Sequence, residues 1–135
     1  MARQEPLYEL LYTSSLAPTA SAGDVAGIAR VSRAHNADCG ITGALIFDGQ
    51  RFCQYLEGPG IAVLNLVRRI ASDPRHVDFV IRHQGPLSGP RRFPAWHLGY
   101  ALAHEGHDLD VLADAQGDEA VARLLQLVPQ CELDP

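Results

Sequence analysis

The sequence lacks four features that would each assign it to a common class of protein. It has no apolar run approaching the roughly 18 residues of a membrane span, and its N-terminus, Met-Ala-Arg-Gln-Glu-Pro, lacks the apolar core of a signal peptide. It has no basic cluster large enough to follow a nucleic-acid backbone, and its formal net charge is −5. It also has no Cys-x-x-Cys pair. We therefore expect a cytoplasmic protein that binds neither a membrane nor a nucleic acid.

The cysteines and histidines do not form a recognisable metal or disulfide pattern. Cys39, Cys53 and Cys131 are odd in number and far apart, so we expect reduced thiols. His104 and His107 lie in a Gly-containing polar turn, which favours a solvated surface. We therefore expect no bound metal.

What the sequence does contain indicates one globular domain. A chain of 135 residues can bury about two thirds of the surface that its unfolded form exposes. Its 47% of hydrophobic and 20% of charged residues are typical of a folded, soluble protein. The pattern changes after Ala103. We expect residues 1–103 to form the main unit and residues 104–135 a C-terminal helical cap or output segment of the same domain.

The first half of the chain predicts strands and a helix in alternation. Apolar runs predict strands at Leu7–Thr13, Gly40–Phe47 and Gln50–Glu57. A serine cap followed by apolar residues at helical spacing predicts a helix from Ser21 to about Asn36. The dipeptide Asp48-Gly49 is a strong hairpin signal, so we expect the second and third strands to pair.

The second half completes a known arrangement. We expect a helix at Pro59–Asp73, strands at Val77–Arg82 and Trp96–Leu102, and helical segments at 108–115 and 118–128. The order β-α-β-β-α-β plus a fifth strand matches a ferredoxin-like α+β fold, in which two helices cover one face of an open sheet. A short C-terminal helical extension follows. We expect a ligand in the groove between the two helices.

Two polar residues lie inside otherwise apolar strands. Tyr12 follows Leu11 in the first strand, and Gln54 lies between Phe52 and Leu56 on one face of the third. Burying an unpaired hydroxyl or amide costs about 1–3 kcal/mol, so these groups need partners. If the first and third strands are neighbours, the two side chains meet, and Gln54 can bridge a phenol and a heteroaromatic ligand. The alternative is that Gln54 lies on a sheet face exposed to water.

Several short sequence motifs occur in the same order along the chain as in a known family. They are Leu10–Ser14 (LLYTS), Ser32–Asn36 (SRAHN), Gly40–Leu45 (GITGAL), Phe52–Gly58 (FCQYLEG), Asp73–His76 (DPRH) and Arg92–Trp96 (RFPAW). Together they resemble the BLUF family of flavin-based blue-light sensors over roughly residues 7–102. The resemblance implies a bound flavin, FAD or alternatively FMN, between the two helices.

The resemblance also implies roles for individual residues. Tyr12 would give an electron and a proton to the light-excited flavin, and Gln54 would relay the proton and change its hydrogen bonds. Asn36 would hold the C4=O and ring-nitrogen edge, and Arg69 would meet the C2=O side. The other residues expected at the ring or its ribityl chain are Ile28, Ser32, His35, Phe52, Ile70, Asp73, His76, Trp96 and Leu98.

Some of these residues have simpler explanations, and one departs from the family. Asn36 also suits a helix end, and Trp96 suits a core. His35 also suits a helix C-terminus because of the macrodipole. Leu98 stands where the family usually has methionine, whose thioether is a weak acceptor, so Gln54 has one possible partner fewer.

We expect a light sensor that is not an enzyme. Its output would be contact with an unidentified downstream signalling protein, and we expect a homodimer or higher oligomer. The C-terminal segment would cap the free sheet face or form a dimer contact. The alternatives are a light-insensitive flavin-binding protein, which Leu98 keeps open, and an acylphosphatase-like small enzyme. The enzyme needs a glycine-rich anion loop with an arginine after the first strand, and Thr13–Ala22 contains neither.

Overall fold

The computed structural model describes residues 6–102, 108–112, 114–128 and 133–134. In chain order the elements are β1 (Leu7–Leu16), the short 3-10 helix η1 (Ala22–Asp24), α1 (Val25–Cys39), β2 (Thr42–Phe47), β3 (Arg51–Pro59), α2 (Gly60–Ser72), β4 (His76–Pro86), β5 (Gly99–Leu102), the 3-10 helix η2 (Asp108–Leu112), α3 (Gly117–Leu127) and β6 (Leu133–Asp134).

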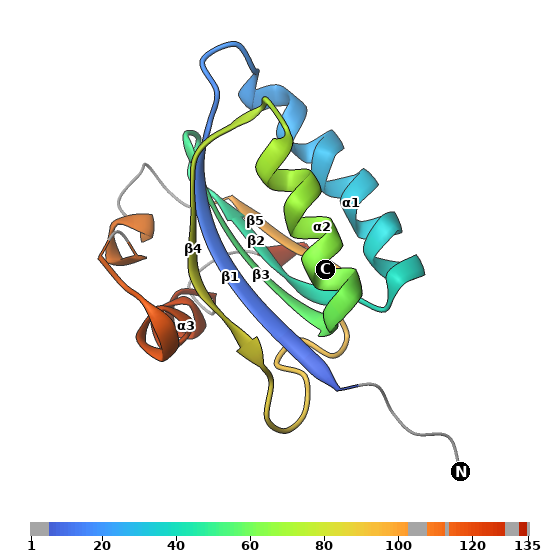
Figure 1. Ribbon diagram of the computed structural model, residues 1–135. Helices are drawn as coiled ribbons and strands as arrows, with labels where there is room; N and C mark the ends of the chain where they lie inside the picture. Colours follow the sequence, from blue (N-terminus) through green and yellow to red (C-terminus); the bar gives the residue numbers. More distant parts are fainter. Residues whose placement is uncertain (1–5, 103–107, 113, 129–132, 135) are drawn as a thin grey trace.

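The strands form one sheet in the order β4-β1-β3-β2-β5-β6. The four strands of the ferredoxin-like unit pair antiparallel, and β5 runs parallel to β2. Figure 1 shows α1 and α2 side by side on one face of this sheet and α3 on the other. The predicted α+β fold with two helices on one face is confirmed. The outermost strand, β4, pairs with β1 through two shifts of register, and Asp78 within it has a φ of 54°.

Alternation along the strands divides the core between the two faces. Leu10 and Leu56 pack beneath α2, whereas Leu11 and Tyr55 point to the side of α3. Leu45, Phe47, Phe52 and Leu98 form a third group with residues of α1. The apolar stripe of the C-terminal helix, predicted to cap the sheet or to form a dimer contact, packs against the sheet through Val121 and Leu124.

Several predicted boundaries were wrong, each for a local reason. Helix α1 continues past Asn36 to Cys39 and ends at Gly40, whose φ of 72° breaks the helix. The fifth strand begins at Gly99 and not at Trp96, because the carbonyl groups of His97 and Leu98 accept bonds from side chains of α1 and not from a strand. The two-residue strand β6 was not predicted.

The predicted hairpin between the second and third strands was confirmed. Asp48 Oδ1 accepts bonds from the backbone N–H groups of Gln50 (2.9 Å) and Arg51 (2.6 Å), which closes the expected hairpin between β2 and β3. Cys39 and Cys53 are free thiols. Cys131, His104 and His107 lie outside the described residues. Within the described part of the chain, no helix is both long enough and apolar enough for a membrane span.

Candidate functional site

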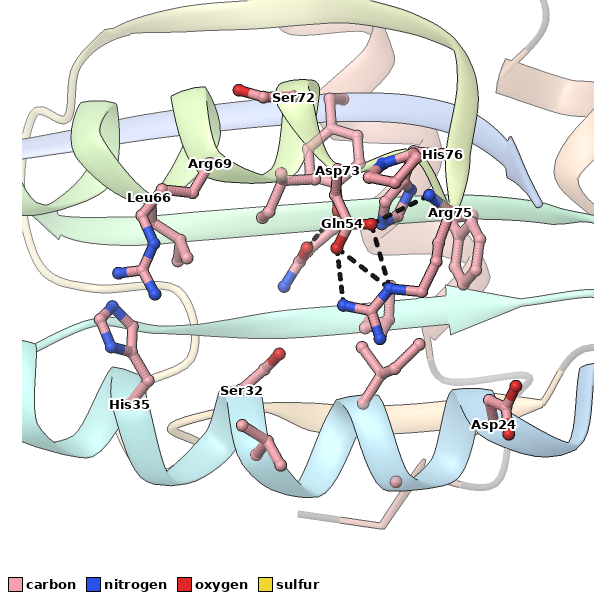
Figure 2. A pocket seen from close by; sticks show the side chains of 18 of the residues that line it. Asp24, Ser32, His35, Gln54, Leu66, Arg69, Ser72, Asp73, Arg75 and His76 are labelled. Carbon is pink, nitrogen blue, oxygen red and sulfur yellow. Dashed lines mark hydrogen bonds and ion pairs between the residues drawn. The ribbon is translucent and has the colours of Figure 1, made fainter. Parts of the chain in front are cut away.

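A cavity of about 950 Å³ lies between α1 and α2, over β1 and β3. Figure 2 shows side chains of both helices and of the sheet around it. Most of the residues predicted to contact a cofactor line this cavity: Tyr12, Ile28, Ser32, His35, Phe52, Gln54, Arg69, Ile70, Asp73 and His76. Asn36, Trp96 and Leu98 do not line it.

Tyr12 and Gln54 form a hydrogen-bonded pair on the sheet beside the cavity. They are direct partners across β1 and β3, so both side chains point to the face that α1 and α2 cover. The Tyr12 hydroxyl donates a hydrogen bond to Gln54 Oε1. Burial, together with the neighbouring Cys53, raises the pKa of Tyr12 far above its usual value, so the phenol keeps its proton. The prediction that the two strands bring these side chains together is confirmed.

Aromatic rings surround this pair. Phe79 stacks on Tyr12 with ring centroids 4.7 Å apart, and the rings of Phe52 and His76 lie 4.8 Å apart. His76 Nδ1 lies 2.9 Å from Ser14 Oγ. Burial lowers the pKa of His76, although the Asp73 carboxylate opposes the shift. We conclude that His76 is neutral at pH 7 and can act as both a donor and an acceptor.

Charged groups gather along the cavity where α2 leads into β4. Arg75 donates from Nε to Asp73 Oδ1 (3.0 Å) and from Nη2 to Asp73 Oδ2 (2.6 Å), and Figure 2 shows this pair. These bonds lower the pKa of Asp73 to about 2. Arg30 and Arg69 also line the cavity. Sequence reasoning named Asp73 but missed Arg75 and Arg30, although Arg75 lies within the DPRH phrase.

Asn36 is completely buried on the inner face of α1, one turn after Ser32. Its Nδ2 donates to the backbone carbonyl of His97 at 2.8 Å. Its Oδ1 is a buried acceptor for which no donor is found among the described residues. Buried acceptors without a donor are rare in folded proteins and call for an explanation. Asn36 is therefore not a helix cap, and its side chain retains capacity for one more hydrogen bond.

Leu98 packs beneath α1 and is fully buried beside Phe52, which lines the cavity. Arg33 Nε donates to the Leu98 carbonyl at 3.0 Å, so the helix holds this residue by its backbone as well. The Leu98 side chain brings no heteroatom to this position.

Trp96, which the sequence predicted beside the cofactor, does not line the cavity in the structure. Trp96 packs with the core cluster on the α3 side of the sheet. Its ring stacks on Phe93 with centroids 5.5 Å apart, and its carbonyl accepts from Gly43 N at 2.9 Å. The alternative reading of Trp96 as a core aromatic is the one that matches its position.

The cavity fits a flavin by the chemistry of its groups. The flavin ring has carbonyl acceptors and an N–H donor along one edge, and the Gln54 amide, which lines the cavity, offers both kinds of complementary group. Asn36 Oδ1, outside the cavity lining on the inner face of α1, is a further acceptor without a donor among the described residues. Ile28, Phe52 and Ile70 line the cavity with apolar surface. The arginines can meet phosphate. Among the described residues, no three His, Cys, Asp or Glu side chains are grouped as a metal site requires.

Comparisons with known proteins point in the same direction. The chain is 40% identical, over 93 residues, to the photoactivated adenylate cyclase subunit beta of Euglena longa. It is 32% identical, over 74 residues, to the blue light- and temperature-regulated antirepressor BluF of Escherichia coli (strain K12). These matches cover 68% and 55% of this chain, but only 11% and 18% of the relatives.

Solved structures extend the similarity to nearly the whole chain. The dark-state structure of BlrB, a BLUF protein, has a TM-score of 0.75 and 33% identity, with 95% of this chain and 98% of that chain covered. A bacterial light-regulated adenylyl cyclase has a TM-score of 0.67 and 26% identity, with 92% and 34% covered. The family model described as "BLUF: Sensors of blue-light using FAD" matches residues 7–99. The chain therefore belongs to the BLUF family of flavin-based blue-light sensors.

Proposed function

We propose that this chain is a blue-light photoreceptor that holds a flavin between α1 and α2 and detects light through Tyr12 and Gln54. The observation that carries the proposal is the hydrogen bond from the Tyr12 hydroxyl to Gln54 Oε1, on the sheet beside the cavity. A phenol and an amide paired in this way form a short path for an electron and a proton. We also expect the protein to be cytoplasmic.

The cofactor is FAD in this proposal, in agreement with the description of the family. Asn36 and Gln54 would hold the polar edge of the ring, and Ile28, Phe52 and Ile70 would pack on its faces. Arg69 would meet the C2=O side of the ring, and the groups that remain for the ring edge and the ribityl chain are Ser32, His35, Asp73 and His76. FMN is the alternative, and extraction of the bound flavin followed by chromatography distinguishes the two.

Tyr12 starts the response. A bound flavin supplies absorption of blue light and, once excited, a strong one-electron oxidant. Tyr12 gives up one electron from its phenol ring, and the oxidised phenol becomes a strong acid. In the dark the raised pKa of Tyr12 holds this proton in place, so release of the proton depends on light.

Gln54 converts this transfer into a new arrangement of hydrogen bonds. Its Oε1 accepts the Tyr12 hydroxyl bond, so it is the first acceptor that the proton meets. The amide then rotates or changes its tautomer while the electron and proton return to Tyr12, and no net covalent product forms. Because the site is buried, each changed bond has a larger effect than it would have in water.

The test is reconstitution of the purified chain with FAD, followed by blue light. We expect a yellow protein whose flavin band shifts reversibly to the red. Gln54→Leu should bind flavin and lose the shift, and Gln84→Leu, at an exposed position of β4, is the matched control. A colourless protein, or a shift that survives in Gln54→Leu, would contradict the proposal.

A light-insensitive flavin-binding protein is the second candidate. It is favoured by one observation, the buried Leu98 beside Phe52, which gives Gln54 no sulfur acceptor after the amide rearranges. The same experiment separates the two candidates, because this second protein would be yellow and unchanged by light.

The output that we infer is contact with another protein. The relatives include cyclases and an antirepressor, in which the matched part is a small fraction of the chain. Residues 104–135 would be the cap or output segment, and the receptor would act as a homodimer or higher oligomer. Size-exclusion chromatography with light scattering, in the dark and under blue light, measures the assembly state.

A further inference from the structure

A second polar cluster lies on the sheet face opposite the cavity. Glu9 and Glu57 are direct partners across β1 and β3, and they are 5% and 0% exposed. Tyr55 donates from its hydroxyl to Glu9 Oε1 at 2.8 Å and to Glu57 Oε1 at 3.3 Å. Two adjacent buried carboxylates are tolerated only where enough donors surround them. The proposed photochemistry does not use this cluster.

Two of the four donors to the Glu57 side chain are backbone groups of the loop between β4 and β5. The backbone N–H of Arg92 donates to Glu57 Oε1 at 2.7 Å, and that of Phe93 donates to Glu57 Oε2 at 2.8 Å. Thr42 Oγ1 also donates to Oε2 at 2.8 Å. The two backbone groups lie outside any helix or strand, so the carboxylate takes the place of a sheet partner.

The other end of this loop is held from the cavity side. Helix α1 binds the carbonyls of His97, through Asn36, and Leu98, through Arg33. The segment from Arg92 to Leu98 is therefore fixed at one end by Glu57 and at the other by α1. This segment therefore links the Glu57 cluster, on the α3 side of the sheet, to helix α1 on the cavity side.

Between these two anchors lie the aromatic residues that face α3. The Phe93 and Trp96 rings stack at an interplanar angle of 17°, and both belong to the cluster that contains Leu124 of α3. Gly99, the first residue of β5, packs against this stack: a Cβ atom at Gly99 would come within 2.7 Å of the Trp96 ring. The stack thus has little freedom to move unless one of the anchors changes.

We propose that Glu57 is a positioning residue that fixes the Phe93–Trp96 stack against α3. When the hydrogen bonds of Asn36 change, the His97–Leu98 end of the segment Arg92–Leu98 then moves while its Arg92–Phe93 end stays bound to Glu57. The part of this inference that concerns light rests on the proposed photoreceptor function. The anchor itself depends only on the geometry of Glu57 and the loop.

A carboxylate is required at this position because each hydrogen-bond partner of the Glu57 side chain among the described residues is a donor. Oε1 faces the Arg92 N–H and the Tyr55 hydroxyl, and Oε2 faces the Phe93 N–H and the Thr42 hydroxyl. Glutamine would turn an NH₂ group toward one of the two backbone N–H groups in either orientation. Glu57→Gln should therefore release one of these amides while it preserves the size of the side chain.

The first experiment compares Glu57→Gln with Glu9→Gln in the flavin-loaded protein. Glu9→Gln makes the same chemical change in the same cluster, but Glu9 bonds to no backbone group of the loop in the described contacts. Trp96 is the single tryptophan of the chain, so its emission reports on the stack. We expect both variants to keep the flavin red shift, and only Glu57→Gln to lose most of the light-induced change in Trp96 emission. Equal Trp96 responses in the two variants would overturn the proposal.

The second experiment is hydrogen exchange on the wild-type protein, which does not depend on light or on the folding of a variant. We expect the Arg92 and Phe93 amides to exchange at least about fivefold more slowly than those of the exposed Ser88 and Gly89, as one net hydrogen bond implies. Equal exchange overturns the anchor. A wild-type protein without any red shift would instead refute the proposed function, and the exchange result would still decide the anchor.

Discussion

The two faces of the central sheet carry polar groups of opposite character. On the side of α1 and α2, Asn36 Oδ1 has no donor among the described residues, and the Gln54 amide lies beside the cavity. On the side of α3, Glu57 accepts bonds from four donors. Both sets are buried within strands or helices of the same small fold.

This difference in hydrogen bonding distinguishes polar groups that can bind a ligand from polar groups that stabilise the fold. A saturated network stabilises one arrangement, because any change leaves a donor or a carboxylate unpaired. A side chain with an unused bond can accept a ligand and can rearrange around it. The same buried polar chemistry therefore serves stability on one face and, as we propose, function on the other.

The sharpest way to break this comparison is to remove one hydroxyl from each face. Tyr12→Phe should abolish the light-induced red shift and reduce the free energy of unfolding by only about 1 kcal/mol. Tyr55→Phe should keep the shift and destabilise the fold by about 2–3 kcal/mol, because both carboxylates lose a donor. Urea unfolding and the light-minus-dark spectrum measure the two effects. Similar losses of stability in both variants would remove the distinction between the faces.

Asn36→Leu tests the unused acceptor directly. We expect the affinity for flavin to fall about tenfold, which corresponds to one hydrogen bond of about 1.4 kcal/mol. Fluorescence titration of the flavin measures this affinity, with Asn65→Leu at an exposed position of α2 as the control. An unchanged affinity would show that Asn36 Oδ1 does not meet the ligand.

The ion pair beside the cavity should make stability depend on acid pH. The Arg75 side chain lowers the pKa of Asp73 from 3.8 to about 2 in the folded protein. The unfolded chain therefore binds this proton first, and the stability from Asp73 is complete above about pH 4 and is lost as the pH falls toward 2. Because the pair is partly exposed, we expect about 1 kcal/mol. Thermal unfolding of wild type, Asp73→Asn and the control Asp38→Asn across this range measures the effect, which Asp73→Asn should lack.

Leu98→Met should have the smallest effect. The sulfur gives the rearranged Gln54 amide a weak acceptor, so we expect recovery of the dark spectrum to slow about threefold, as a contact of about 0.6 kcal/mol implies. Leu124→Met, in α3, is the control. A faster recovery in Leu98→Met would mean that the thioether does not stabilise the lit arrangement.

The positions of Tyr12 and Gln54 on the cavity side of the sheet could be predicted from the sequence, because both residues lie in regular strands. Alternation along β1 and β3 placed Tyr12 and Gln54 on one face, and the order of the elements made these strands neighbours. Two regular elements with known periodicity determine that meeting. No loop conformation has to be known.

The positions that depend on a loop could not be predicted in the same way. Trp96 was predicted near the cofactor from the family resemblance, and its segment was predicted as a strand. In the structure Asn36 and Arg33 instead hold the carbonyls of His97 and Leu98, so this segment is a loop. Glu57 received no role, because a carboxylate near the end of a strand normally faces water. Its partners lie 35 and 36 residues further along the chain, in a loop without periodicity.

The irregular pairing of β4 also limits how copies of the chain can assemble. This strand forms one edge of the sheet, and its two register shifts and the left-handed backbone of Asp78 interrupt the regular row of peptide groups that an incoming strand would need. Edge-to-edge growth of the sheet is therefore disfavoured on this side. An oligomer of this chain would then not form by adding a strand of another copy to β4.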